Sequence, residues 1–296
     1  MNRREAGFLL LTSHLGDPER KPLSVSQLRI LAQRMQAMEK TEADRELCTE
    51  DLLHLGYGRE MAQRILGLLS QEDLFSYYLK QGQRAGCIPV SRVSEAYPQL
   101  LRYRLGLDAP GCLWAKGDLT LLNRPAIALV GSRELQEENR RFARAVGIHA
   151  AENGFVLVSG NARGADRTAQ EACLTAGGKV ISIVADALSK QPLRENILYL
   201  SEDGFEESFS AQRAISRNRC IHALGQVVFV AQAALGKGGT WDGTVKNLRR
   251  NMSPVICFRD GSEASVELEQ MGAYLIDQEQ LQEFHNFSTN DTFLDR

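Results

Sequence analysis

The sequence predicts an α/β protein with a doubly wound, mainly parallel sheet in a Rossmann-like arrangement, preceded by a small all-helical domain. From residue 126 onward, short apolar runs alternate with amphipathic segments, the pattern of strands joined by helical crossovers. These runs are nearly continuous in apolar residues, as expected for strands that helices cover on both faces. With 296 residues, 43% of them hydrophobic, the chain can form one large domain or two modest ones.

Residues 1–85 are expected to form the helical (SAM-like) domain. Ser24 is a candidate N-cap for a helix over 25–38, in which apolar residues recur at helical spacing. The segment 59–69 repeats that spacing. Short helices joined by glycine-containing turns indicate a small bundle.

Residues 86–125 contain Gly, Pro and short apolar pieces, and we expect a linker that adds one or two edge strands. The Rossmann-like domain follows over 126–280, with a helix over 140–153 and a polar tail over 281–296. Its strands are expected at 126–130, 155–159, 179–184, 226–231, 254–258 and 273–276.

Charge is unevenly distributed, although the net charge is only −2. Residues 211–250 hold seven basic residues and one acidic residue, which favours a polyanionic ligand. Residues 195–208 hold five acidic residues and no basic residue, and their simplest interpretation is a solvated loop.

The sequence gives no sign of a metal site or a membrane segment. Its six cysteines lie far apart without a C-x-x-C pair, so neither a zinc site nor a disulfide framework is indicated. No apolar run approaches the roughly 18–20 residues that span a bilayer. We therefore expect a cytoplasmic protein without metal or cofactor.

Two glycine–arginine loops follow neighbouring predicted strands. In a parallel sheet their backbone N–H groups and guanidinium groups meet at the carboxyl edge, which indicates an anion site, for phosphates in particular. Asp166 is open to three interpretations: it favours the dipole of the following helix, holds Arg163, or contacts a ribose or base. The candidate residues are Gly131, Ser132 and Arg133 in the first loop, and Ser159, Gly160, Arg163, Gly164 and Asp166 in the second.

Two further motifs extend this candidate site. One is an arginine-rich helix in which Arg213 and Arg217 lie one turn apart, so these two are expected to line one cleft. The other is a glycine-rich turn before a helix, which also offers N–H groups to an anion. The candidate residues are Arg217, Asn218 and Arg219 in the helix, and Lys237, Gly238, Gly239 and Thr240 in the turn. Neither G-x-G-x-x-G nor a P-loop is present, so dinucleotide binding and ATP hydrolysis are disfavoured.

No convincing catalytic set accompanies these loops. His222 is expected to face the core, and Asp166 and Asp242 are the only carboxylates within the motifs. The loops suit binding without bond chemistry, so we expect no enzyme. Trp241, Phe209 and Phe205 are candidate surfaces for base stacking, although such residues more often lie in the core.

Taken together, these motifs resemble the DNA-processing protein A (DprA/Smf) family. The resemblance covers roughly residues 1–275 and includes 97–101, 113–119, 128–133, 159–166 and 217–219. It implies an extended Rossmann fold, binding and protection of single-stranded DNA, delivery of that DNA to the RecA recombinase in natural transformation or recombination, and a homodimer.

The chain departs from the family pattern in three ways. Gln232 stands where the family carries a carboxylate, the loop 236–240 differs, and no winged-helix segment follows residue 276. The sequence is therefore expected to be a divergent member. Two other functions stay open: a sensor or phosphoribohydrolase-like enzyme for a free nucleotide, and a scaffold whose pocket is vestigial.

Overall fold

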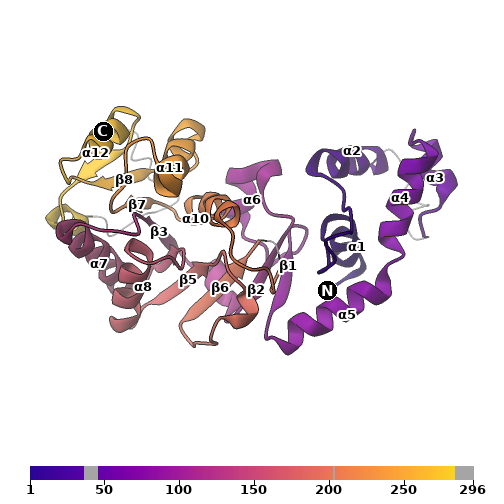
Figure 1. The fold of residues 1–296 in the computed structure, drawn as a ribbon, viewed down its shortest axis with the longest axis horizontal. Helices are drawn as coiled ribbons and strands as arrows, with labels where there is room; N and C mark the ends of the chain where they lie inside the picture. The colour runs from indigo at the N-terminus through magenta and orange to yellow at the C-terminus, as the bar shows by residue number, and fades with distance from the viewer. Residues whose placement is uncertain (37–45, 203, 284–296) are drawn as a thin grey trace.

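Nine strands form one sheet across the centre of the protein (Figure 1). The structure is a computed structural model that describes residues 1–36, 46–202 and 204–283. The order is β1-β2-β6-β5-β4-β3-β7-β8-β9. The strands are β1 (Ile88–Ser91), β2 (Cys112–Lys116), β3 (Ala126–Val130), β4 (Val156–Ser159), β5 (Lys179–Ile183), β6 (Ile197–Ser201), β7 (Val228–Val230), β8 (Val255–Phe258) and β9 (Tyr274–Ile276).

The strands from β6 to β9 pair in parallel, while β1 and β2 add an antiparallel edge. Strand order reverses between β3 and β7, because the chain builds outward from β3 to β6 on one side and from β7 to β9 on the other. This arrangement confirms the predicted Rossmann-like α/β class. It also creates a crevice at the carboxyl ends of β3 and β7, where sheets of this kind bind ligands.

Helices cover both faces of the sheet. Along β3, successive side chains point alternately into the core on one face and the core on the other. Ile127 and Leu129 belong to one core cluster with α7 (Glu137–Glu152) and α8 (Ala165–Thr175). Ala126, Ala128 and Val130 belong to the other cluster, with residues of α6 (Gln99–Leu105), α10 (Asn218–Leu224) and α11 (Gly238–Arg250). The other elements around the sheet are α9 (Ala211–Ser216), α12 (Glu263–Gln270), and the 3-10 turns η2 (Gly106–Asp108), η3 (Leu119–Asn123), η4 (Leu188–Lys190) and η5 (Glu279–Glu283).

The N-terminal region is helical, and its core is small. Leu31, Leu52 and Ile65 are among the residues of that core. Ser24 caps its helix through a reciprocal capping box with Gln27, as predicted. The expected end of this helix at Met38 lies outside the described residues. The helices are α1 (Arg3–Thr12), α2 (Val25–Met35), α3 (Thr49–His54), α4 (Arg59–Leu69) and α5 (Glu72–Arg84).

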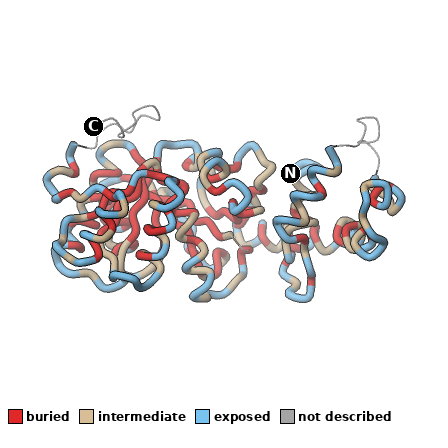
Figure 2. Tube along the Cα trace, turned by 90° about the horizontal axis from the view of Figure 1, so that it is seen from above, coloured by how far each residue is buried: buried red, intermediate tan, exposed pale blue. Residues whose placement is uncertain are grey.

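An aromatic cluster joins the helical region to the sheet. Tyr78 of α5 packs edge-on against Trp114 of β2, with ring centroids 5.3 Å apart, and Phe205 lies 4.8 Å from both rings. Residues of the sheet and of α5 therefore belong to one core cluster. In Figure 2 the buried positions gather mainly in the region of the sheet. Phe205 is only 6% exposed, so it belongs to this junction and offers no stacking surface to a base.

The structure corrects the interpretation of residues 195–208 as a solvated loop. Strand β6 runs through this stretch with all five residues buried. Glu202 follows it directly, and its side chain is 7% exposed because it accepts a hydrogen bond from Arg219. The expected boundary of the tail at residue 281 falls inside η5, where Leu281 is buried; residues 284–296 lie outside the described range.

Across the described segments, none of the helices has the length and apolar character needed to cross a membrane. Within the same segments, no group of three or more His, Cys, Asp or Glu residues is placed to hold a metal ion.

Candidate functional site

A pocket of about 450 Å³ lies at the carboxyl edge of the sheet, at the point where strand order reverses. The loop after β3, the start of α8, the α9–α10 segment and the start of α11 form its walls. Ten of the residues that line it were predicted from the sequence: Gly131, Ser132, Arg133, Asp166, Arg217, Asn218, Lys237, Gly238, Gly239 and Thr240. Three of the four predicted motifs thus supply most of this surface.

The rim of the pocket is basic and open to solvent. The side chains of Arg133 and Lys237 are exposed there. Gly238, Gly239 and Thr240 form the first turn of α11, and the side chain of the N-cap residue, Lys237, accepts no capping hydrogen bond from it. First-turn N–H groups have no partner within their own helix, and the helix dipole places partial positive charge beside them. The rim therefore suits an anion such as a phosphate.

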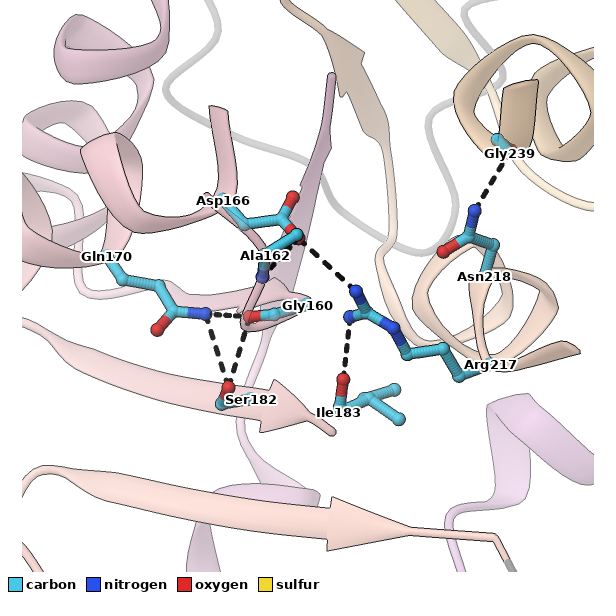
Figure 3. Close-up of polar contacts among 9 residues, drawn as sticks. All are labelled: Gly160, Ala162, Asp166, Gln170, Ser182, Ile183, Arg217, Asn218 and Gly239. Atoms are coloured by element: carbon cyan, nitrogen blue, oxygen red, sulfur yellow. Dashed lines mark hydrogen bonds and ion pairs between the residues drawn. The ribbon is translucent and has the colours of Figure 1, made fainter. Parts of the chain in front are cut away.

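A buried ion pair forms the floor. Arg217 Nη2 lies 3.5 Å from Asp166 Oδ2, and both side chains are less than one-tenth exposed. Arg217 Nη1 also donates to the carbonyl of Ile183 at 2.6 Å, while Asp166 accepts a hydrogen bond from the Ala162 N–H. Figure 3 shows this network. Burial raises the pKa of the Asp166 carboxyl, and the Arg217 charge opposes that shift.

Arg217 retains an unused donor. Its Nε atom is buried and has no hydrogen-bond partner within the described residues. A buried donor left unpaired costs free energy, so this atom is a local cost to stability that the described residues do not offset. The floor thus combines a fixed positive charge with a donor that the protein itself leaves unsatisfied.

Two glycines of the second loop are explained by packing. A Cβ at Gly160 would overlap the Arg217 guanidinium and the Asp166 carboxylate, so only glycine leaves room for the ion pair. Gly164 has φ +88°, and a Cβ there would overlap the carbonyl oxygens of Ser132 and Arg133. These glycines let the two loops and the ion pair approach one another.

Side-chain hydrogen bonds to the Gly160 carbonyl also stabilise the second loop. Ser182 of β5 donates to the Gly160 carbonyl at 3.1 Å, and Gln170 of α8 bonds the same carbonyl (Figure 3). Ser159, at the end of β4, is fully buried. Ser159 and Gly160 therefore lie beneath the pocket and do not line it.

Three predicted arginines have other partners. Arg163 does not line the pocket; it lies 3.5 Å from Glu134, and Asp166 pairs with Arg217 in its place. Arg213 donates to the carbonyls of Ala185 and Glu207 and does not share a cleft with Arg217. Arg219 donates to Glu202 at 2.6 Å and faces a neighbouring hollow. Spacing along the chain did not reveal these partners, which come from loops that follow β3, β5 and β6.

Hydrogen bonds of two amide residues, Asn218 and Gln232, connect two helices and one loop around the pocket. Asn218 of α10 donates to the Gly239 carbonyl at 2.9 Å, which ties α10 to the first turn of α11 (Figure 3). The backbone carbonyl of Gln232 accepts from the Ser132 N–H, and its side chain accepts from the Gln136 N–H. Gln232, where the sequence was expected to depart from the family pattern, thus anchors the loop after β3.

The sequence missed Ile215 as a site residue. It lies on the pocket wall and is 47% exposed. The available signal was an apolar residue in a short, polar helix between two arginines. Of the aromatic residues considered for stacking, Trp241 is buried, as is Phe205, while Phe209 is exposed outside the pocket.

His222 faces the core, as predicted. It is fully buried, and its Nδ1 lies 3.1 Å from Asn247 Nδ2 of α11. Burial lowers the pKa of His222 to about 4, so the ring is neutral over most of the pH range in which proteins are stable. Ser253 completes this polar cluster beneath α11 through bonds to His222 and Asn247.

The sequence pattern of the family described as DNA recombination-mediator protein A matches residues 89–285, more than half of the chain. The chain belongs to this family. The match includes every strand except the first residue of β1, and all of the pocket.

Solved structures of family members share the fold. The DNA processing protein A of Streptococcus pneumoniae superimposes with a TM-score of 0.74 at 26% identity, covering 97% of this chain and 100% of that one. The DNA processing protein A of Helicobacter pylori gives a TM-score of 0.56 at 26% identity, covering 68% of this chain and 94% of that one.

Curated DprA sequences match over shorter stretches. The S. pneumoniae protein is 37% identical over 141 residues, which is 44% of this chain and 50% of that protein. The Bacillus subtilis protein is 31% identical over 166 residues, covering 52% and 54%. The chain therefore matches about half the length of these relatives.

Proposed function

We propose that this DprA/Smf family member binds and protects single-stranded DNA in the pocket at the reversal of strand order. The observation that carries the proposal is the convergence of Arg133, Lys237 and the first turn of α11 above the buried Arg217. Each supplies positive charge or N–H donors, and backbone phosphates are recognised by such groups. The related H. pylori structure is described as one of single-stranded DNA binding, which supports the same ligand class.

The test is a binding titration with labelled single-stranded and double-stranded oligonucleotides across a salt series. Wild-type protein is expected to prefer the single strand. Arg133→Ala and Lys237→Ala are each expected to weaken binding and to reduce the slope of log K against log salt by about 0.7, the value for one lost phosphate contact on a single strand. Arg144→Ala removes the same charge from an exposed site on α7 outside the pocket and serves as the matched control. Equal affinity of all four proteins contradicts the proposed site.

We further propose that the bound strand is delivered to the RecA recombinase during DNA uptake or recombination, by a homodimer in the cytoplasm. Family membership supports this role. The test measures RecA filament formation on DNA covered by a single-strand-binding protein, with wild type and Arg133→Ala compared. Acceleration by wild type alone is the expected result, and no acceleration by either protein contradicts delivery. Light scattering at several protein concentrations measures the oligomeric state.

The site is proposed to bind without catalysing. Asp166 is the one carboxylate among the described residues that line the pocket. It is buried and engaged with Arg217, which leaves it poorly placed to transfer protons to a ligand. Incubation with oligonucleotides and with nucleoside monophosphates is expected to return both unchanged. Release of a free base or a shortened strand by wild type, with loss of that release in Asp166→Asn, contradicts the proposal and favours the hydrolase alternative.

A further inference from the structure

A second hollow adjoins the pocket along α11. This hollow of about 310 Å³ lies farther along the same helix, between α11, the α9–α10 segment and η2. Ile215 lines both hollows, so they adjoin at this exposed apolar side chain. Helix α11 passes from one to the other, with Gly239 and Thr240 in the first and Gly243 and Lys246 in the second.

The dimensions suit a continuous chain. Gly239 and Lys246 are seven residues apart on α11. At about 1.5 Å per residue they are separated by about 10 Å along the axis, which is the rise of about three stacked nucleotides at about 3.4 Å each. A ligand of one nucleotide fills the first hollow only, whereas a strand that leaves it along α11 enters the second.

Three basic and two acidic side chains line this second hollow, and one of the three, Arg219, is already paired with Glu202. Lys246 is exposed and has no ion pair among the residues that the structure describes. Arg250 is 59% exposed and lies 2.8 Å from Asp108, from which a phosphate oxygen can draw it at little cost because exposed ion pairs are weak. Arg219 keeps a buried Nε without a partner in the described chain. Asp242 is the other acidic residue of the lining.

We propose that this second hollow is a subsite for the next nucleotides of the same single strand, with Lys246 and Arg250 on its phosphates and Ile215 between the two subsites. The inference rests on the proposed function. It makes the site selective for a polymer over a free nucleotide, because only a polymer reaches both hollows. The two acidic residues, Asp108 and Asp242, limit the charge of this subsite, so its contribution is smaller than that of the pocket.

The experiment measures affinity for an oligo-dT ladder from one to about sixteen nucleotides, which spans the common single-strand site sizes of about 4–16 nucleotides. The variants are Lys246→Ala and Arg250→Ala. The matched control is Arg249→Ala, since Arg249 is exposed on the same helix and lines neither hollow. Thermal melting of each variant verifies the fold.

Lys246→Ala and Arg250→Ala are expected to bind the shortest oligomers as wild type does and to bind the longer ones about two- to fivefold more weakly, as for loss of one exposed charge pair. Lys246→Ala is also expected to reduce the salt slope by about 0.7 on long oligomers only. Equal behaviour of Lys246→Ala and Arg249→Ala on long oligomers overturns the subsite and leaves the proposed function intact. Failure of wild type to bind any length overturns the proposed function itself.

Discussion

The floor and the rim of the pocket use the same residue type for different purposes. Arg217 in the floor is buried, holds Asp166 and bonds a strand carbonyl. Arg133 on the rim is exposed and faces solvent. An arginine in a motif therefore has two distinct uses, and burial separates them. Floor residues are expected to set the stability of the site, and rim residues its affinity.

The largest effect is expected from breaking the floor. Arg217→Ala leaves Asp166 charged, buried and unpaired, which is expected to lower the free energy of unfolding by about 3–5 kcal/mol. Chemical denaturation measures it. The double variant Arg217→Met with Asp166→Asn removes both charges and is expected to lose clearly less. A loss below about 0.5 kcal/mol in Arg217→Ala, the range of ordinary surface substitutions, would show that Arg217 does not stabilise the fold and acts like the rim residues.

The free energy of unfolding is expected to fall in acid, because the buried His222 beneath α11 resists protonation. The pKa of His222 is about 4 in the folded protein against 6.5 ordinarily, so the unfolded chain binds a proton that the folded chain rejects. The contribution of His222 to stability is therefore complete above about pH 6.5. It is lost as pH falls toward 4, by about 1.4 kcal/mol per pH unit. Denaturation between pH 7 and 4 is expected to show a shallower dependence in His222→Asn; an unchanged dependence contradicts this assignment.

Gly160→Ala tests whether the second loop is shaped by packing. The added methyl overlaps the ion pair, so destabilisation of about 1–3 kcal/mol is expected, as for other overpacked sites. Gly67→Ala is the matched control: Gly67 is exposed within α4 with open space around it, and alanine there is expected to be neutral or to stabilise by up to about 1 kcal/mol. Melting curves measure the stability of both variants. Equal changes in melting temperature for Gly160→Ala and Gly67→Ala would contradict the packing explanation.

The smallest change in stability is expected at the rim. Arg133→Ala is expected to leave the free energy of unfolding within about 0.5 kcal/mol of wild type while weakening single-strand binding about tenfold, the value of one charge-assisted contact. Arg163→Ala is expected to weaken it less, because Arg163 lies beside Glu134 outside the pocket. A larger loss in Arg163→Ala would redraw the rim to include that side chain.

Much of the architecture was predictable because local pattern and packing agree. Six apolar runs predicted β3, β4, β5, β7, β8 and β9 to within about two residues at their ends. The exception, β6, was hidden among acidic residues, since Ile197–Ser201 is short and the glutamates around it dominate the local composition. One of those glutamates, Glu202, is tolerated in a buried place because Arg219 pairs with it.

By itself the sequence determined the fold class, the family and the edge of the sheet where the motifs meet, because strand and helix periodicities and glycine turns are local properties. Only the tertiary structure decided which arginines are available to a ligand. Arg217 and Arg219 stand two positions apart in one motif, yet one is held by Asp166 of α8 and the other by Glu202 after β6. These partners lie 51 and 17 residues away along the chain, and burial, which no local pattern encodes, fixes the use of each charge.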